Sequence, residues 1–70
     1  REKREMEQIE AELEQLEADM EALNTEKAEL EAQLSEGSLS YEQVTEKSLR
    51  YEQVKELLDE KELRWLELSE

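Results

Sequence analysis

Histidine and cysteine are both absent from the chain, and their absence removes several kinds of chemistry. Without imidazole or thiolate groups, the chain lacks the usual general base, the usual thiol nucleophile and the usual ligands of zinc. Disulfides are excluded for the same reason. The single glycine cannot build a glycine-rich loop that cradles a phosphate group. We therefore expect these 70 residues to form no enzyme and to contain no catalytic residue, metal site or cofactor site.

Proline and long apolar runs are also missing. No stretch of 18 apolar residues exists to cross a membrane, and no signal-peptide pattern opens the chain, so we expect a soluble, cytoplasmic protein. The chain begins at Arg1 in a helical pattern, which suggests a fragment of a larger protein. Acidic residues number 22 against 9 basic ones, and the formal net charge is −13. We expect most of these carboxylates to form solvated faces, because so many charges do not suit a compact globule.

Apolar residues in the first half follow a heptad pattern, with alternating spacings of three and four residues from Met6 to Leu34. Only Lys27 interrupts this row. The pattern predicts an α-helix over about residues 3–35. A weaker row, with Lys47 and Lys61 in two of its places, predicts a second helix over about residues 41–68.

Residues 36–40 carry the signals of a turn between the two helices. Gly37 suits the left-handed position just past a helix end. Ser40 and Gln43 have the spacing of a capping box, and Leu39 and Val44 have that of a hydrophobic staple. These features predict an all-α fold, a two-helix antiparallel coiled-coil hairpin that is a monomer and occupies residues 1–70 as one domain.

One alternative is a continuous helix in a parallel homodimer. One row of heptad positions keeps its phase across Gly37, but the other row would continue into Ser48, Lys55 and Glu62. We therefore favour the hairpin. Its predicted core consists of Met6, Ile9, Leu13, Leu16, Met20, Leu23, Leu30, Leu34, Val44, Tyr51, Val54, Leu58, Trp65 and Leu68.

Aromatic and basic residues are the candidates for contact with nucleic acid. We expect Trp65 to pack in the core and Tyr41 to be exposed. Two groups of cations could meet a phosphate backbone, one at the open end and one near the turn, where folding back would bring Lys27 opposite Arg50. The candidate contact residues are Arg1, Lys3, Arg4, Lys27, Lys47 and Arg50. The simpler interpretation is that each cation pairs with a neighbouring glutamate.

The opening Lys3-Arg4-Glu5, the long acidic helix, the Ser/Gly turn and the closing segment Arg64-Trp65-Leu66-Glu67-Leu68-Ser69-Glu70 together resemble the C-terminal coiled-coil domain of ABC-F ATPases of the Uup type. The resemblance covers essentially the whole chain. It implies that two ATP-binding cassettes lie upstream in the same chain and hold ATP and Mg²⁺. It also implies that the hairpin contributes to contact with DNA or with ribosomal RNA during translation.

Two classes of function remain open at this point. The chain is an accessory, nucleic-acid-contacting arm of an ATPase, or it is a structural coiled coil that spaces, tethers or dimerises a larger protein. The net charge of −13 opposes a broad contact with phosphate, so any such contact must be focal. Leu63 and Leu66, three residues apart and outside the heptad rows, form a candidate docking strip for another domain.

Overall fold

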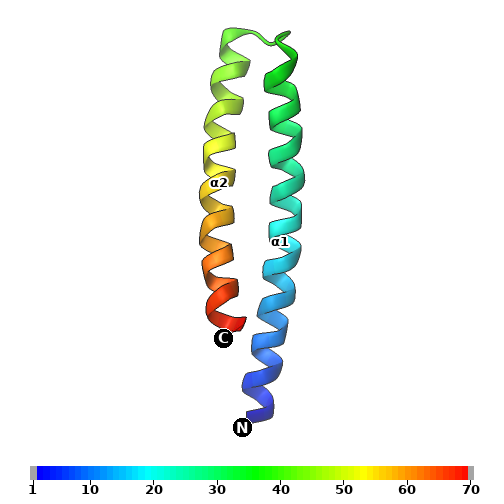
Figure 1. The fold of residues 1–70 in the computed structure, drawn as a ribbon, viewed down its shortest axis with the longest axis vertical. Helices are drawn as coiled ribbons and strands as arrows, with labels where there is room; N and C mark the ends of the chain where they lie inside the picture. The colour runs from blue at the N-terminus through cyan, green and yellow to red at the C-terminus, as the bar shows by residue number, and fades with distance from the viewer. Residues whose placement is uncertain (1, 70) are drawn as a thin grey trace.

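Two α-helices make up the computed structural model, which describes residues 2–69 and the side chains of residues 5–69. Helix α1 spans Glu2–Glu36 and helix α2 spans Tyr41–Ser69. The helices lie side by side and run in opposite directions, so both ends of the chain lie at the same end of the molecule (Figure 1). The protein is therefore an all-α antiparallel hairpin, as predicted, and not one continuous helix. Its dimensions are 55 × 15 × 14 Å.

The turn, residues 37–40, follows the local signals in the sequence. Gly37 has a φ of +73°, the left-handed conformation that a residue without a Cβ adopts at little cost. The capping box is formed in both directions: the backbone N–H of Gln43 donates to Ser40 Oγ at 3.2 Å, and the backbone N–H of Ser40 donates to Gln43 Oε1 at 3.1 Å. Gly37 thus ends α1, and the capping box starts α2. The expected helix ranges were 3–35 and 41–68. The start of α2 agrees with the structure, and each of the other three helix ends differs by one residue.

The core is a single seam between the two helices. Leu16, Leu30 and Val54 are its buried members, and Val54 is fully covered. Most other residues of the predicted core are half-buried, because two helices alone cover each side chain from only part of its surroundings. The half-buried members are Leu13, Met20, Leu23, Leu34, Tyr51, Leu58, Trp65 and Leu68.

Three residues of the predicted core are exposed. Met6 is 62% exposed, because α1 projects beyond the end of α2 and leaves this turn without a partner (Figure 1). Ile9 and Val44 are 38% and 39% exposed and lie toward the two ends of the seam, where fewer neighbours cover them. Tyr41 is exposed, as expected. No helix within residues 2–69 has the length and apolar character needed to cross a membrane.

Candidate functional site

One side of the seam carries a row of ion pairs between the helices, and we call it the ion-pair side. Arg64 donates two hydrogen bonds to the Glu12 carboxylate, at 2.6 and 3.2 Å. Arg50 donates two to the Glu26 carboxylate, at 2.5 and 2.9 Å. The paired N–H groups of a guanidinium match the two oxygens of a carboxylate. Each arginine therefore neutralises a carboxylate and also holds the two helices in register.

Lysines in the heptad row of α2 continue the same side. Lys61 Nζ lies 3.2 Å from Asp19 Oδ2, and Lys47 Nζ donates to Gln33 Oε1 at 2.8 Å. Both lysines are half-buried. They fill seam positions with aliphatic carbons and carry the ammonium group out to a polar partner on α1.

Three kinds of contact between the helices each occur twice, two heptads apart. The Glu12–Arg64 pair repeats as Glu26–Arg50, and the Asp19–Lys61 pair repeats as Gln33–Lys47. The third kind joins an aromatic side chain to a glutamate: Trp65 Nε1–H donates to Glu17 Oε1 and the Tyr51 hydroxyl donates to Glu31 Oε1, both at 3.2 Å. A constant register over the length of the hairpin produces this repetition.

The ion pairs shift the pKa values of their partners in the directions expected for mutual stabilisation. The hydrogen bonds from Arg64 and Arg50 hold the pKa of Glu12 and that of Glu26 below their ordinary values. The same bonds raise the pKa of each arginine. The pKa of Asp19 is lowered by hydrogen bonds from Gln15 and, next, from Lys61. All these groups are reached by water, so each pair contributes little to stability by itself.

A groove lies on the other side of the seam, and its position follows from side-chain size. Tyr51, Leu58 and Trp65 occupy the same heptad position of α2 in successive turns of the pattern. The two large rings reach across to glutamates of α1, whereas the smaller Leu58 lies between them opposite Asn24. The shorter side chains leave a hollow between two aromatic contacts.

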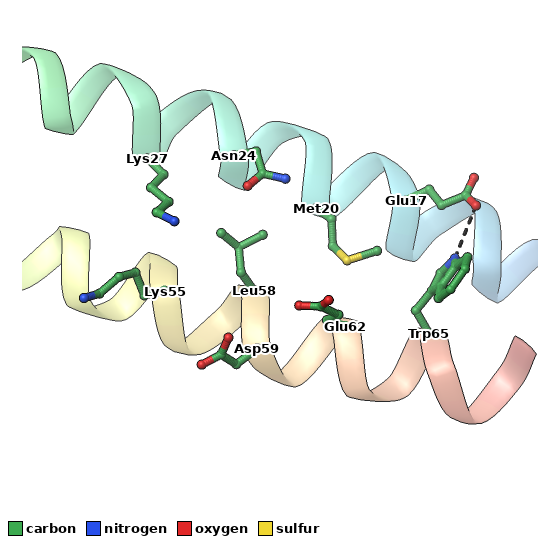
Figure 2. Close-up of a pocket in the computed structure, with 9 residues that line it drawn as sticks. All are labelled: Glu17, Met20, Asn24, Lys27, Lys55, Leu58, Asp59, Glu62 and Trp65. Atoms are coloured by element: carbon green, nitrogen blue, oxygen red, sulfur yellow. Dashed lines mark hydrogen bonds between the residues drawn. The ribbon is translucent and has the colours of Figure 1, made fainter.

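The groove brings two lysines to one end and an indole to the other (Figure 2). Lys27 comes from α1 and Lys55 from α2, and the Lys55 ammonium also lies 5.0 Å from the centre of the Tyr51 ring. Met20 and Leu58 form its apolar part, and Trp65 closes the far end. The remaining lining residues are polar: Glu17, Asn24, Asp59 and Glu62.

The chemistry available in this groove is binding. Lys27 and Lys55 supply positive charge at one end, and a half-buried indole at the other end offers a flat apolar face. Glu12, Asp19 and Glu26 lie on the ion-pair side, and the pKa values of their carboxyl groups are lowered, which makes them poorer proton acceptors. Among the described residues, no three acidic side chains are placed to hold a metal ion.

The expected cation group near the turn is divided between the two sides of the seam. Lys47 and Arg50 bind Gln33 and Glu26 on the ion-pair side, whereas Lys27 lines the groove with Lys55. Adjacent residues lie about 100° apart around a helix, so Glu26 reaches Arg50 while Lys27 projects elsewhere. The sequence had suggested that Lys27 and Arg50 form one site. The structure instead places them on different sides of the seam.

The second expected group, Arg1, Lys3 and Arg4, lies outside the described side chains. The sequence analysis missed Lys55 as the neighbour of Lys27. It expected cations to pair with neighbouring glutamates but did not identify the partners of Arg64 and Lys61 on α1. The spacing of Glu12 and Glu26 by two heptads, matched by that of Arg50 and Arg64, was the signal that could have revealed the pairs. It becomes meaningful only once the turn sets the register.

A comparison with known protein families shows which family this hairpin belongs to. The sequence matches the model of the family described as ABC transporter C-terminal domain over residues 1–70. The chain belongs to this family. It is therefore an accessory domain of an ABC-type protein and not itself a catalytic one, in agreement with a groove suited to binding. No curated protein and no solved structure shows a significant match to the chain.

Proposed function

We propose that this hairpin is the non-catalytic C-terminal arm of an ABC-F type ATP-binding protein of the Uup type, and that it assists the parent ATPase in the cytoplasm by a focal contact with nucleic acid. Two ATP-binding cassettes upstream in the same chain would hold ATP and Mg²⁺. The nucleic acid would be DNA or ribosomal RNA. Family membership supports the arm, and the groove supports the contact.

The observation that carries the nucleic-acid contact is that Lys27 and Lys55 line one end of a groove that holds Trp65 at the other. Neither lysine is bound to a carboxylate of the opposite helix within the described part of the chain, although Lys55 pairs with Glu52 of its own helix at 3.2 Å. Lys27 can therefore meet a phosphate directly, Lys55 can do so by exchanging its exposed partner Glu52, and a base can stack on the indole. Three carboxylates, those of Glu17, Asp59 and Glu62, border the same groove and limit the affinity.

A second function, that of a structural spacer, is favoured by the ion-pair side. Three cations of α2 are paired with carboxylates of α1: Arg50, Lys61 and Arg64. The remaining surface is strongly acidic. Such a rod, 55 Å long, could hold other parts of the parent protein apart without touching nucleic acid. The two functions differ in whether Lys27 and Lys55 affect binding.

The test uses the fluorescence of Trp65, the only tryptophan of the chain, during titration with a single-stranded oligonucleotide. Stacking on the indole should quench its emission, with a dissociation constant of about 10⁻⁴–10⁻⁶ M and a steep dependence on salt. The variant Lys27→Gln/Lys55→Gln should lose most of this binding.

A matched control carries the same net charge without changing the groove. Ala18→Glu/Ala32→Glu also lowers the net charge by two, at exposed positions of α1. This control should retain most of the quenching. Equal losses in both variants, or no quenching of the original chain at low salt, would reject the contact in the groove and leave the spacer function.

A further inference from the structure

Two exposed leucines form an apolar patch on the outer face of α2, away from the seam. Leu63 is 62% exposed and Leu66 is 49% exposed. A spacing of three residues makes them neighbours on the helix surface. They line a shallow hollow together with Asp59 and Glu62, and we call these four residues the outer patch.

The charge around the outer patch is one-sided because the nearby cations bind other carboxylates. Lys55 pairs with Glu52 of its own helix. Lys61 binds Asp19, and Arg64 binds Glu12 and its own neighbour Glu67. Within the described part of the chain, Asp59 and Glu62 have no cationic partner. The Asp59 side chain points away from α1 in Figure 2. The two leucines are therefore flanked by carboxylates whose charge is not neutralised within the hairpin.

We propose that the outer patch docks a cationic amphipathic helix of a partner protein. Leucine-sized side chains of the partner would cover Leu63 and Leu66, and flanking lysines or arginines would meet Asp59 and Glu62. Helices commonly bind in this way, with apolar anchors spaced by three or four residues and charges at the rim. Charge complementarity sets the sign of the partner and favours its approach.

The same charges disfavour other occupants. A second copy of the chain would bring Asp59 and Glu62 against an equally acidic surface, since each chain carries a net charge of −13. A nucleic acid on the two leucines would place phosphates beside the same carboxylates, and no lysine or arginine lines the outer patch to offset them. The outer patch shares Asp59 and Glu62 with the groove but contains no cation, so it accepts a ligand of the opposite sign from the one that we propose for the lysine end of the groove.

The probe for this proposal is a fluorescent 18-residue helical peptide of leucine and lysine, with leucines on one face only. Binding to the 70-residue chain is followed by anisotropy over a range of salt concentrations. A peptide of the same composition, with its leucines scattered around the helix, reports binding by charge alone. We expect the amphipathic peptide to bind at least tenfold more tightly than the scattered one.

Variants of the chain then locate the site. Leu63→Ser/Leu66→Ser should weaken binding of the amphipathic peptide at least tenfold. Leu49→Ser is the matched control, because Leu49 is 63% exposed on the same helix and no residue three or four positions away is apolar. It should change the affinity less than twofold. Circular dichroism should be unchanged in both, since exposed side chains are replaced.

Charge variants give a second, independent measurement. Asp59→Asn/Glu62→Gln should weaken binding at least fivefold and reduce its salt dependence, whereas Glu42→Gln/Glu46→Gln, near the turn, should not. Equal effects of patch and control variants would overturn the proposal. So would self-association of the original chain that Leu63→Ser/Leu66→Ser abolishes, because it would assign the outer patch to a second copy.

Discussion

Replacing Val54 with alanine tests the seam at its best-covered point. Val54 is 0% exposed, whereas Val44, ten residues earlier on α2, is 39% exposed. The substitution Val44→Ala removes the same atoms from the same helix. The two variants therefore differ in burial and not in chemistry.

The magnitude follows from the atoms lost. Removing two buried methylene equivalents costs about 1.6 kcal/mol at ~0.8 kcal/mol each. The space left behind adds a cavity term, while the better helix propensity of alanine returns up to about 0.7 kcal/mol. We expect a net loss of about 1.5–2.5 kcal/mol for Val54→Ala and about 0–0.5 kcal/mol for Val44→Ala, where less surface is buried.

The loss caused by Val54→Ala should be a large part of the total free energy of unfolding. At about 0.05–0.15 kcal/mol per residue, a chain of this length is stable by about 3.5–10 kcal/mol. A change of about 2 kcal/mol should lower the melting temperature by about 8–16 °C, followed by circular dichroism at 222 nm. Urea titration at several protein concentrations separates unfolding from dissociation. Equal melting temperatures for Val54→Ala and Val44→Ala would refute the seam as described.

Three further perturbations test the turn, the ion pairs and the oligomeric state. Gly37→Ala should cost about 1–2 kcal/mol of unfolding free energy from the left-handed backbone alone, since an added Cβ meets no atom within 4 Å, and Gly37→Asn should cost less in the same melts. The pKa values of Glu12 and Glu26 are lowered in the folded state, so their stabilising contribution is present at pH 7 and is lost as the pH falls below 4.5. The difference in melting temperature between the original chain and Glu12→Gln/Glu26→Gln should therefore be measurable at pH 7 and vanish near pH 2; a constant difference would contradict these pairs. Sedimentation equilibrium at micromolar concentration should give the mass of one chain, and a stable dimer would contradict a self-contained hairpin.

Local signals were sufficient to predict the fold. The heptad spacing selects helices, and Gly37 with the Ser40–Gln43 box selects where one ends and the next begins. Each of these signals acts within a few residues, so no knowledge of the tertiary register is needed to interpret it. The exposure of Met6 was not predictable from its heptad position, because it depends on where α2 ends.

The groove depends on information that the sequence carries only indirectly. Whether Lys27 meets Arg50 or Lys55 is decided by which side of α1 each residue faces and by a register set at the turn. Leu58 is a core residue in any heptad assignment, and its role as the floor of a groove arises from the larger rings of Tyr51 and Trp65 on either side. A periodic pattern identifies which positions face the partner helix, and side-chain sizes then decide where the surface is hollow.

The charge pattern also explains why the chain folds back on itself instead of pairing in parallel with a second copy. In a parallel two-stranded coil, residues on one flank of the seam meet residues five positions further along the partner, and the charges of these residues set partner orientation. That arrangement would place Glu5 against Glu10, Glu12 against Glu17 and Glu26 against Glu31, three repulsive contacts in the first helix alone. The antiparallel hairpin gives Glu12 and Glu26 the guanidinium groups of Arg64 and Arg50 instead. An individual ion pair at a solvent-exposed surface adds little stability. At Glu12 and at Glu26, however, the hairpin replaces a repulsion by an attraction, and the free-energy difference between the two architectures is the sum of these changes. A strongly acidic first helix therefore favours the antiparallel hairpin because its few complementary cations lie in the second.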